Sequence, residues 1–258
     1  MGREPGRVGH QRAGRCIRML EADARDRVIV ALDCDRETAL ELGAKLSGHA
    51  NWLKVGMTLY YAEGPSIVKA FKDMGFKVFL DLKFYDIPHQ VRGAARSASL
   101  AGADLLSVHG MGSGAMLAAC REGAEEAAEQ RDDRSKLVAI TVLTSMSQDS
   151  LTEIGINEPV ADEAARLAKL GQDNGIDGIV CSPMEAEAMR KLLGPDALIV
   201  TPGVRPAGAA LGDQARVATP AKAISRGASH IVVGRPITAA DDPLAAYEAI
   251  VSELVEQA

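Results

Sequence analysis

The sequence predicts a single α/β domain with the (β/α)8 barrel fold, and two observations lead to that prediction. Eight short apolar, β-branched runs alternate with helical patterns along about 230 residues. The 258 residues are 47% hydrophobic and 25% charged, a composition that can bury one large core. A doubly wound open sheet is the alternative, and it is disfavoured because no GxGxxG motif follows the first run.

The eight runs have the length and composition of buried parallel strands. We expect strands at residues 28–32, 52–55, 77–80, 104–108, 137–143, 178–181, 197–200 and 230–233. Helical periodicity follows each of them, at residues 36–46, 64–74, 89–101, 113–128, 159–174, 184–193, 220–226 and 243–256. Pro159, Pro220 and Pro243 stand where the first turn of a helix tolerates proline, and glycines follow several expected helix ends.

The N-terminal segment differs from the rest of the chain. Its first 27 residues hold seven arginines and lack the apolar region of a secretory signal. We expect residues 1–26 to be a disordered tail, or an extension upstream of a start at Met19. Residues 27–258 are then expected to form the catalytic barrel.

Charge and cysteine content narrow the class of partner. A net charge of −6 and an aromatic content of 3% give no reason to expect nucleic acid or an anionic membrane. No apolar run approaches transmembrane length. The four cysteines are scattered, without a CxxC pair or histidines at metal-ligand spacing. We therefore expect reduced thiols, no metal site and a cytoplasmic location.

Residues 79–88, FLDLKFYDIP, carry the densest chemical signal in the sequence. The stretch begins as a buried strand, and Asp81 and Lys83 then break the apolar run on the same face. Burying an acid and a base costs free energy unless they pair or serve a reaction. Asp86 follows at odd spacing before Pro88 ends the strand. It can join the other two only if the chain turns, or it serves a site on a neighbouring molecule.

In a barrel, polar residues at the C-terminal ends of the strands share one site. The residues in such positions are Asp33, Lys54, Asp81 with Lys83, His109, Thr144, Ser182, Arg205 and Arg235. A single polar strand end is more often a helix cap, and Asp33 and Ser182 alone could be that. Lys54, however, interrupts an apolar segment where a lysine gains nothing as core. We interpret His109 as a hydrogen-bonded wall residue, because no second histidine follows at ligand spacing.

The C-terminal part of the sequence predicts an anion site. Residues 201–206, TPGVRP, leave the seventh strand, and a Gly/Ala-rich loop then runs to about residue 217. Loops after the seventh and eighth strands of barrels often hold a phosphate. Arg235 offers a bidentate partner, Gly234 lets the backbone approach, and Gln214 could reach in from the loop. The alternative is a flexible surface loop with two solvated arginines, but such a loop is more often a lid.

With these residues assembled, the sequence from about residue 27 onward closely resembles the bacterial branch of the orotidine 5′-monophosphate decarboxylase family. The shared motifs are ALD at 31–33, LKVG at 53–56, DLKFYDIP at 81–88, VLTS at 142–145, TPGVR at 201–205 and VGR at 233–235. The DxKxxDIP string is specific to the superfamily, and its combination with Lys54 indicates this activity. The resemblance implies a homodimer with shared active sites that needs no cofactor or metal. It would convert orotidine 5′-monophosphate to UMP and CO2 in pyrimidine biosynthesis.

The resemblance also implies a role for each matched residue. Lys83 would donate the proton to C6, and Asp81 would lie beside the substrate carboxylate. Lys54 and Asp86 would complete a Lys-Asp-Lys-Asp array, with Asp86 reaching into the partner's site. Substrate would also contact Asp33 and Lys54 at the ribose, Thr144 at the pyrimidine, Gln214, Gly234 and Arg235 at the phosphate, Arg205 at the base of the loop, and Ile87 and Gln90. The family commonly has a threonine where this sequence has Gln90, so the ribose contact across the dimer would either pass to the longer amide of Gln90 or shift elsewhere.

Two rival functions remain open at this point. A metal-dependent sugar-phosphate decarboxylase or aldolase of the same superfamily shares DxKxxD but places an acidic metal ligand on the second strand. Lys54 occupies that position here and would repel a divalent cation. The other rival is a non-catalytic nucleotide binder, which would bind UMP without turnover.

Overall fold

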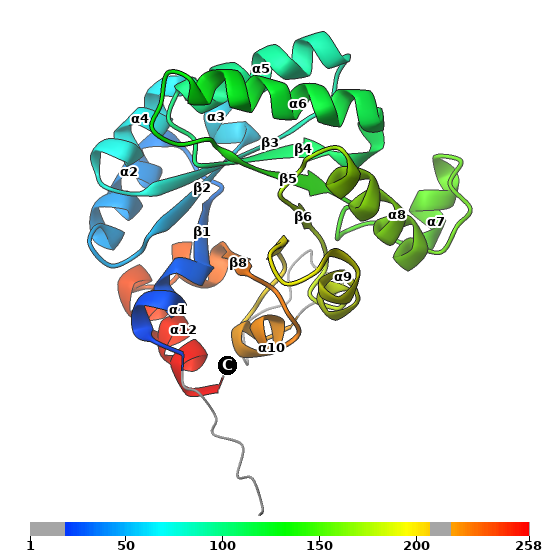
Figure 1. Ribbon diagram of the computed structural model, residues 1–258. Helices are drawn as coiled ribbons and strands as arrows, with labels where there is room; N and C mark the ends of the chain where they lie inside the picture. Colours follow the sequence, from blue (N-terminus) through cyan, green and yellow to red (C-terminus); the bar gives the residue numbers. More distant parts are fainter. Residues whose placement is uncertain (1–18, 207–217, 258) are drawn as a thin grey trace, which may run out of the picture.

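The computed structural model describes residues 19–206 and 218–257. Within them, eight parallel strands close into a barrel, because β1 pairs with both β2 and β8. In chain order they are β1 (Val28–Leu32), β2 (Trp52–Gly56), β3 (Lys77–Phe84), β4 (Leu105–His109), β5 (Lys136–Ile140), β6 (Gly178–Val180), β7 (Leu198–Thr201) and β8 (His230–Val233). Figure 1 shows the strands at the centre with helices around them. The predicted (β/α)8 barrel is confirmed.

The predicted helices form the outer layer, and their bounds lie within two residues of the expected ones. They are α2 (Arg36–Leu46), α4 (Pro65–Asp73), α5 (Pro88–Leu100), α6 (Ser113–Ala128), α8 (Val160–Asp173), α9 (Ala186–Leu193), α10 (Pro220–Ser225) and α12 (Pro243–Gln257). Five further short elements were not predicted, because one or two turns give little helical periodicity. They are α1 (Glu21–Arg27), α3 (Met57–Glu63), η1 (Gly110–Gly112), α7 (Gln148–Glu153) and α11 (Arg235–Thr238). Among the described helices, none has the length and hydrophobicity that a transmembrane span requires.

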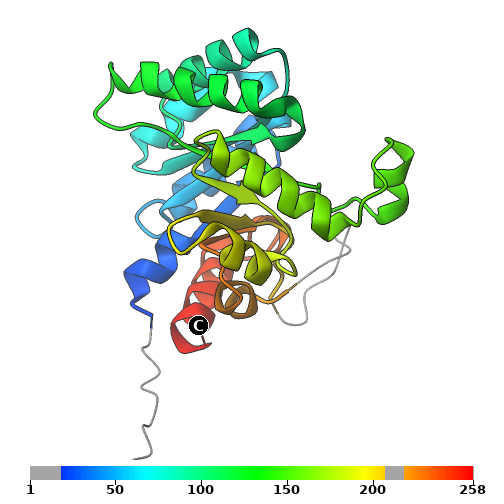
Figure 2. The ribbon, with the colours of Figure 1, turned by 45° about the vertical axis from the view of Figure 1, so that its right-hand side comes forward.

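Helix α1 shifts the predicted boundary of the N-terminal tail. Ala24 is fully buried, and α1 lies beside α12 in both views of the ribbon (Figures 1 and 2). The guanidinium of Arg25 contacts the carboxylate of Glu248, on α12, at 2.7 Å. Residues 21–26 therefore belong to the outer layer. The predicted disordered tail, residues 1–26, included them and in that respect was wrong. A seven-residue helix with one fully buried alanine gives almost no sequence signal, and residues 1–18 lie outside the described part.

The interior of the barrel is filled by side chains that point inward from alternate strand positions. One apolar cluster holds these inward residues, which are Ile29, Ala31, Trp52, Phe79, Leu105, Val138, Val200 and Val232. Their outward neighbours, such as Val30 and Leu80, belong to a second and larger cluster that the strands share with the helices. The interior is thus a closed plug rather than a channel. Two positions beyond Trp52 and Phe79, the same inward face presents Lys54 and Asp81.

Candidate active site

A cavity of about 480 Å³ opens above this plug, at the C-terminal ends of the strands. That volume lies in the range of small-molecule sites. Its lining consists of Ala31, Asp33, Lys54, Phe79, Asp81, Lys83, Ile140, Val142, Leu143, Thr144, Val180, Pro202, Gly203, Arg205, Val232, Gly234, Arg235 and Thr238. The wall is apolar where strands β3, β5, β6 and β8 contribute, and charged where β1, β2 and β3 end. The structure therefore brings together the polar strand ends that the sequence placed far apart.

Four charged side chains of alternating sign form a continuous line along one wall. Lys54 Nζ lies 3.1 Å from Asp33 Oδ1 and 3.7 Å from Asp81 Oδ2. Lys83 Nζ donates a hydrogen bond of 2.9 Å to the other carboxylate oxygen, Asp81 Oδ1. The strand register explains the order, because β1, β2 and β3 are successive neighbours in the barrel. Lys54 therefore meets carboxylates from the strands on both sides, while Lys83 pairs with Asp81 of its own strand.

The line runs from solvent into the protein. The side chain of Asp33 is 67% exposed, whereas those of Lys54 and Asp81 are only 10% and 12% exposed. Burial by itself would raise the pKa of Asp81, but the ammonium groups of Lys54 and Lys83 outweigh it and hold that pKa below its ordinary value. Asp81 is accordingly a fixed negative charge at neutral pH, not an acid that donates a proton.

Two residues that sequence reasoning did not single out shape this line. A Cβ atom at Gly56 would lie 3.2 Å from Asp33 Oδ1 and 3.3 Å from Lys54 Nζ, tighter than ordinary contacts, so both groups would have to shift by a few tenths of an ångström. Ser107, on β4, is fully buried, and its hydroxyl contacts both Asp81 and the backbone of Lys83. Nothing in the sequence marks that serine, because its partners lie on the neighbouring strand.

The predicted anion-binding residues lie elsewhere on the same cavity wall. Arg205, Gly234 and Arg235 line the cavity, as does Thr144, and Thr238 on α11 joins them without having been predicted. A Cβ atom at Gly234 would meet Ala31 at 3.6 Å, an ordinary contact, so there is space for a small side chain at this position. Gln214 lies outside the described residues, so its predicted contact stays a prediction.

The end of the DxKxxDIP string is placed differently. Asp86, Ile87 and Gln90 do not line the cavity, and all three are exposed on the described chain. Asp86 Oδ1 accepts a 2.6 Å hydrogen bond from the amide of Ile87, which fixes the turn before α5. Tyr85 and Ile87 are each 63% exposed, a large apolar area for one turn. Within a single chain, the third carboxylate therefore stands apart from the charged line.

The remaining polar strand ends have local structural partners. His109 Nδ1 accepts a hydrogen bond from the amide of Met111, and its ring stacks on Tyr85 with centroids 5.3 Å apart. Burial and the nearby charge of Lys83 lower the pKa of His109, so the ring is neutral at neutral pH. Ser182 Oγ accepts a hydrogen bond from the amide of Met184 and thereby stabilises the turn after β6. Ser182 is not the N-cap of the following helix, because that position in α9 is held by Glu185.

The chain is similar to known proteins over most of its length. Residues 26–250 match the model of the orotidine 5′-phosphate decarboxylase / HUMPS family. The chain is 48% identical to orotidine 5′-phosphate decarboxylase from Moorella thermoacetica over 92% of its own length and 95% of that protein. It is 50% identical to the protein of that name from Alkalilimnicola ehrlichii, over 90% and 97%.

A solved structure agrees with these relatives. The crystal structure of orotidine 5′-phosphate decarboxylase from Lactobacillus acidophilus superimposes with a TM-score of 0.80 and 40% identity, covering 88% of this chain and 98% of that one. Fold and sequence are thus similar over most of this chain and nearly all of that one. The chain belongs to the orotidine 5′-phosphate decarboxylase / HUMPS family.

Proposed function

We propose that the protein decarboxylates orotidine 5′-monophosphate to UMP and CO2, a step of pyrimidine biosynthesis. The observation that carries the proposal is the line Asp33, Lys54, Asp81 and Lys83 on the wall of a cavity that also holds Arg205 and Arg235. A nucleotide monophosphate offers a complement to both parts. Its phosphate suits the arginines, and its base and ribose suit the apolar and charged walls.

The reaction explains why fixed charges would be needed. When the bond from C6 to the carboxylate breaks, the electron pair stays on C6, where no adjacent carbonyl can delocalise it. Enzymes lower barriers by roughly 8–23 kcal/mol, and electrostatic preorganisation is commonly the largest share. An ammonium group held beside C6 would stabilise that pair without any rearrangement during the reaction. Lys83 is held in this way by its 2.9 Å hydrogen bond to Asp81.

We assign the proton transfer to Lys83. A proton from its ammonium group would pass to C6 as CO2 leaves, giving UMP and a neutral amine that is reprotonated from solvent. Asp81 would lie next to the departing carboxylate, and Lys54 would bind the ribose together with Asp33. Lys54 also contacts Asp81 from the side opposite Lys83, since the two lysines use different carboxylate oxygens. The carboxylate is thereby prevented from rotating away.

The phosphate end would supply the binding energy. Contacts of Arg235, Gly234 and Arg205 with the phosphate, joined by Gln214 from the loop, are remote from C6. Interactions of that kind can offset the cost of bringing the substrate carboxylate next to Asp81. Thr144, on the segment after β5, would contact the pyrimidine.

We further propose a homodimer in which Asp86, Ile87 and Gln90 serve the partner's site. The support is their position outside their own cavity and the exposed apolar side chains of Tyr85 and Ile87 around them. Asp86 would then extend the alternating line of the other subunit. For the enzyme as a whole we propose a cytoplasmic location.

The test is the fall in ultraviolet absorbance when orotidine 5′-monophosphate is added to protein that has been treated with EDTA. Steady turnover to UMP is expected. Binding of UMP without turnover would favour the nucleotide binder. Turnover that is lost with EDTA and returns with Mg²⁺ would favour the metal-dependent rival. The ammonium of Lys54 at 3.7 Å from Asp81 argues against that rival, because it places a positive charge where a divalent cation would approach.

A further inference from the structure

We propose that Ser107 is a positioning residue for this reaction, because its one hydroxyl group holds both the backbone of Lys83 and the carboxylate of Asp81. The inference rests on the proposed function for its effect on catalysis, and on contacts within the chain for its geometry. Ser107 does not line the cavity, so any effect on turnover must pass through the two residues that it touches.

The pairing of strands β3 and β4 is irregular. Strand β3 pairs with β4 in regular register at Leu80 and Leu106, and again at Phe84 and Val108. Between these pairs, residues 81–83 of β3 lie opposite Ser107 alone. Such a bulge leaves backbone groups of the longer strand without their normal ladder partners. Both charged residues of the site that come from β3 lie in this bulge.

The backbone of Lys83 is strained within the bulge. Its φ angle is +51°, in the left-handed region that residues with a Cβ atom seldom adopt. The amide of Lys83 donates a 2.9 Å hydrogen bond to Ser107 Oγ. The serine hydroxyl thus takes the place of the missing ladder carbonyl and stabilises a conformation that would otherwise relax.

The second bond of the hydroxyl follows from the first. Because Ser107 Oγ accepts from the amide of Lys83, its own proton is free to point at Asp81 Oδ1, which lies 2.7 Å away. The same oxygen of Asp81 accepts the 2.9 Å bond from Lys83 Nζ. Ser107, Asp81 and Lys83 therefore close a ring of hydrogen bonds that fixes the carboxylate and the start of the lysine side chain together. In a buried position such a ring leaves little freedom.

The chain offers a matched control for this claim. Ser99, on α5, is as fully buried as Ser107, but its hydroxyl has no hydrogen-bond partner among the described residues. Ser99→Ala removes the same atom from a buried site without breaking a bond to the charged line. The pair of variants separates the loss of positioning from the general effect of removing a buried oxygen.

The experiment measures kcat, KM and UMP affinity for wild type, Ser107→Ala, Ser107→Thr and Ser99→Ala. Ser107→Ala should lose roughly 10²-fold in kcat, the usual effect of a misplacement of about 1 Å, with UMP affinity within about threefold of wild type. Ser107→Thr keeps the hydroxyl and should recover most of kcat, and Ser99→Ala should retain all of it. Equal kcat in Ser107→Ala and wild type would overturn the proposal, as would equal losses in Ser107→Ala and Ser99→Ala.

A crystal structure of Ser107→Ala tests the geometry without relying on turnover. The expected result is that the φ angle of Lys83 leaves the left-handed region or that the carboxylate of Asp81 rotates. Unchanged conformations of both residues would overturn the positioning role. Wild-type protein without any turnover would instead overturn the proposed function, and the crystal structure would still decide on Ser107.

Discussion

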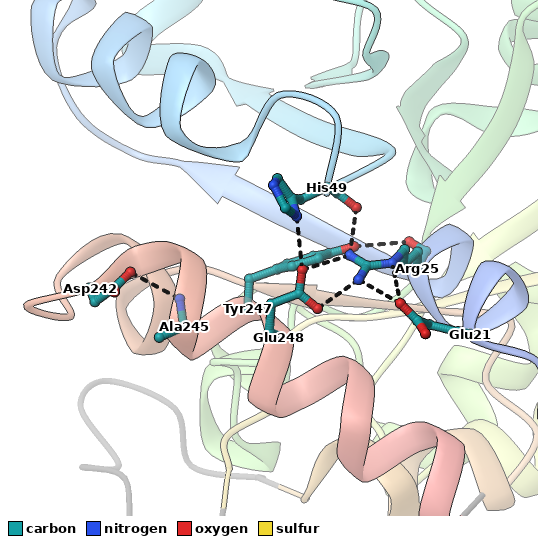
Figure 3. A network of polar contacts seen from close by, with 7 residues as sticks. All are labelled: Glu21, Arg25, His49, Asp242, Ala245, Tyr247 and Glu248. Atoms are coloured by element: carbon teal, nitrogen blue, oxygen red, sulfur yellow. Dashed lines mark hydrogen bonds and ion pairs between the residues drawn. The ribbon is translucent and has the colours of Figure 1, made fainter.

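At the N-terminal end of the barrel, the guanidinium of Arg25 lies between the carboxylates of Glu21 and Glu248 (Figure 3), whereas at the other end the carboxylate of Asp81 lies between two ammonium groups. Both networks alternate in charge, and both join elements that are distant in the sequence. We call the first the end clamp, comprising Glu21, Arg25, His49, Tyr247 and Glu248, and the second the charged line, comprising Asp33, Lys54, Asp81 and Lys83.

The end clamp is centred on the guanidinium of Arg25. Arg25 makes two bonds to Glu248, of 2.7 and 2.9 Å, two to Glu21 and one to the carbonyl of His49, and the ring of His49 contacts Glu248 at 3.1 Å. Hydrogen bonding to Glu248 raises the pKa of Arg25, and the same bonds lower that of Glu248. The network ties α1 to α12 and to His49, in the turn after α2.

The charged line differs in two respects. Its Lys54 to Asp81 contact is 3.7 Å long, and Lys83 has a strained backbone. The bonds of the end clamp stabilise the fold. The charged line instead keeps a long contact and a strained residue on the wall of a cavity that a ligand can enter. Alternating charge alone therefore does not indicate function. Buried charge combined with backbone strain on a cavity wall is the stronger indication.

The largest expected effect comes from removing Lys83. Lys83→Ala should lower kcat by at least about 10⁴-fold, because the proposed proton donor and the charge proposed to lie beside C6 disappear together. UMP affinity should change by less than about tenfold, since the proposed phosphate contacts are untouched. Steady-state kinetics and calorimetric titration with UMP measure the two quantities. Near-normal decarboxylation by this variant would refute the assignment of Lys83.

A mixture of two inactive variants tests whether the charged line is completed across a dimer. In a heterodimer of Lys83→Ala and Asp86→Ala, one of the two sites regains both residues. A mixture re-equilibrated at equal amounts should therefore show roughly a quarter of wild-type activity. Each variant alone, treated in the same way, is the control. If the mixture stays as inactive as its components while heterodimers are demonstrably present, Asp86 does not act across the interface.

The end clamp should respond in the opposite sense. Arg25→Ala should lower the free energy of unfolding by about 2 kcal/mol, because several charge-assisted hydrogen bonds of a mostly buried side chain are lost. Its kcat should be unchanged at temperatures where it is folded. Arg36→Ala is the matched control. It removes an arginine that is 45% exposed and paired with Glu63, and should cost less than about 0.5 kcal/mol.

A smaller effect is expected from pH, also at the N-terminal end. Burial lowers the pKa of His230 from 6.5 to about 4, despite the opposing charge of Asp26. Between pH 6.5 and about 4, the imidazole of His230 is protonated in the unfolded chain but neutral in the folded chain. His230 therefore destabilises the fold as pH falls through this range. In His230→Gln, denaturant unfolding at pH 7 and pH 4.5 should differ less than in wild type, by on the order of 1–2 kcal/mol. An unchanged pH dependence would show that the ring is not protected from protonation.

The sequence predicted the barrel well because strand and helix periods are local signals. It also predicted which strand ends carry charge, and Lys54, Asp81 and Lys83 indeed lie together. Their roles in the reaction remain predictions. The contribution of Ser107 was not predictable, since a bulge between two strands decides which residues of β3 face it. The end clamp was missed for a related reason, because Arg25 resembles the tail arginines until its distant partner Glu248 is known.

We propose that the charged line serves catalysis and that the end clamp serves stability. The decisive measurement is kcat for orotidine 5′-monophosphate in wild type, Lys83→Ala and Arg25→Ala, at one temperature where all three are folded. We expect Arg25→Ala to stay within about twofold of wild type, while Lys83→Ala falls by at least about 10⁴-fold. Losses of similar size in the two variants, or full activity in Lys83→Ala, would contradict this proposal.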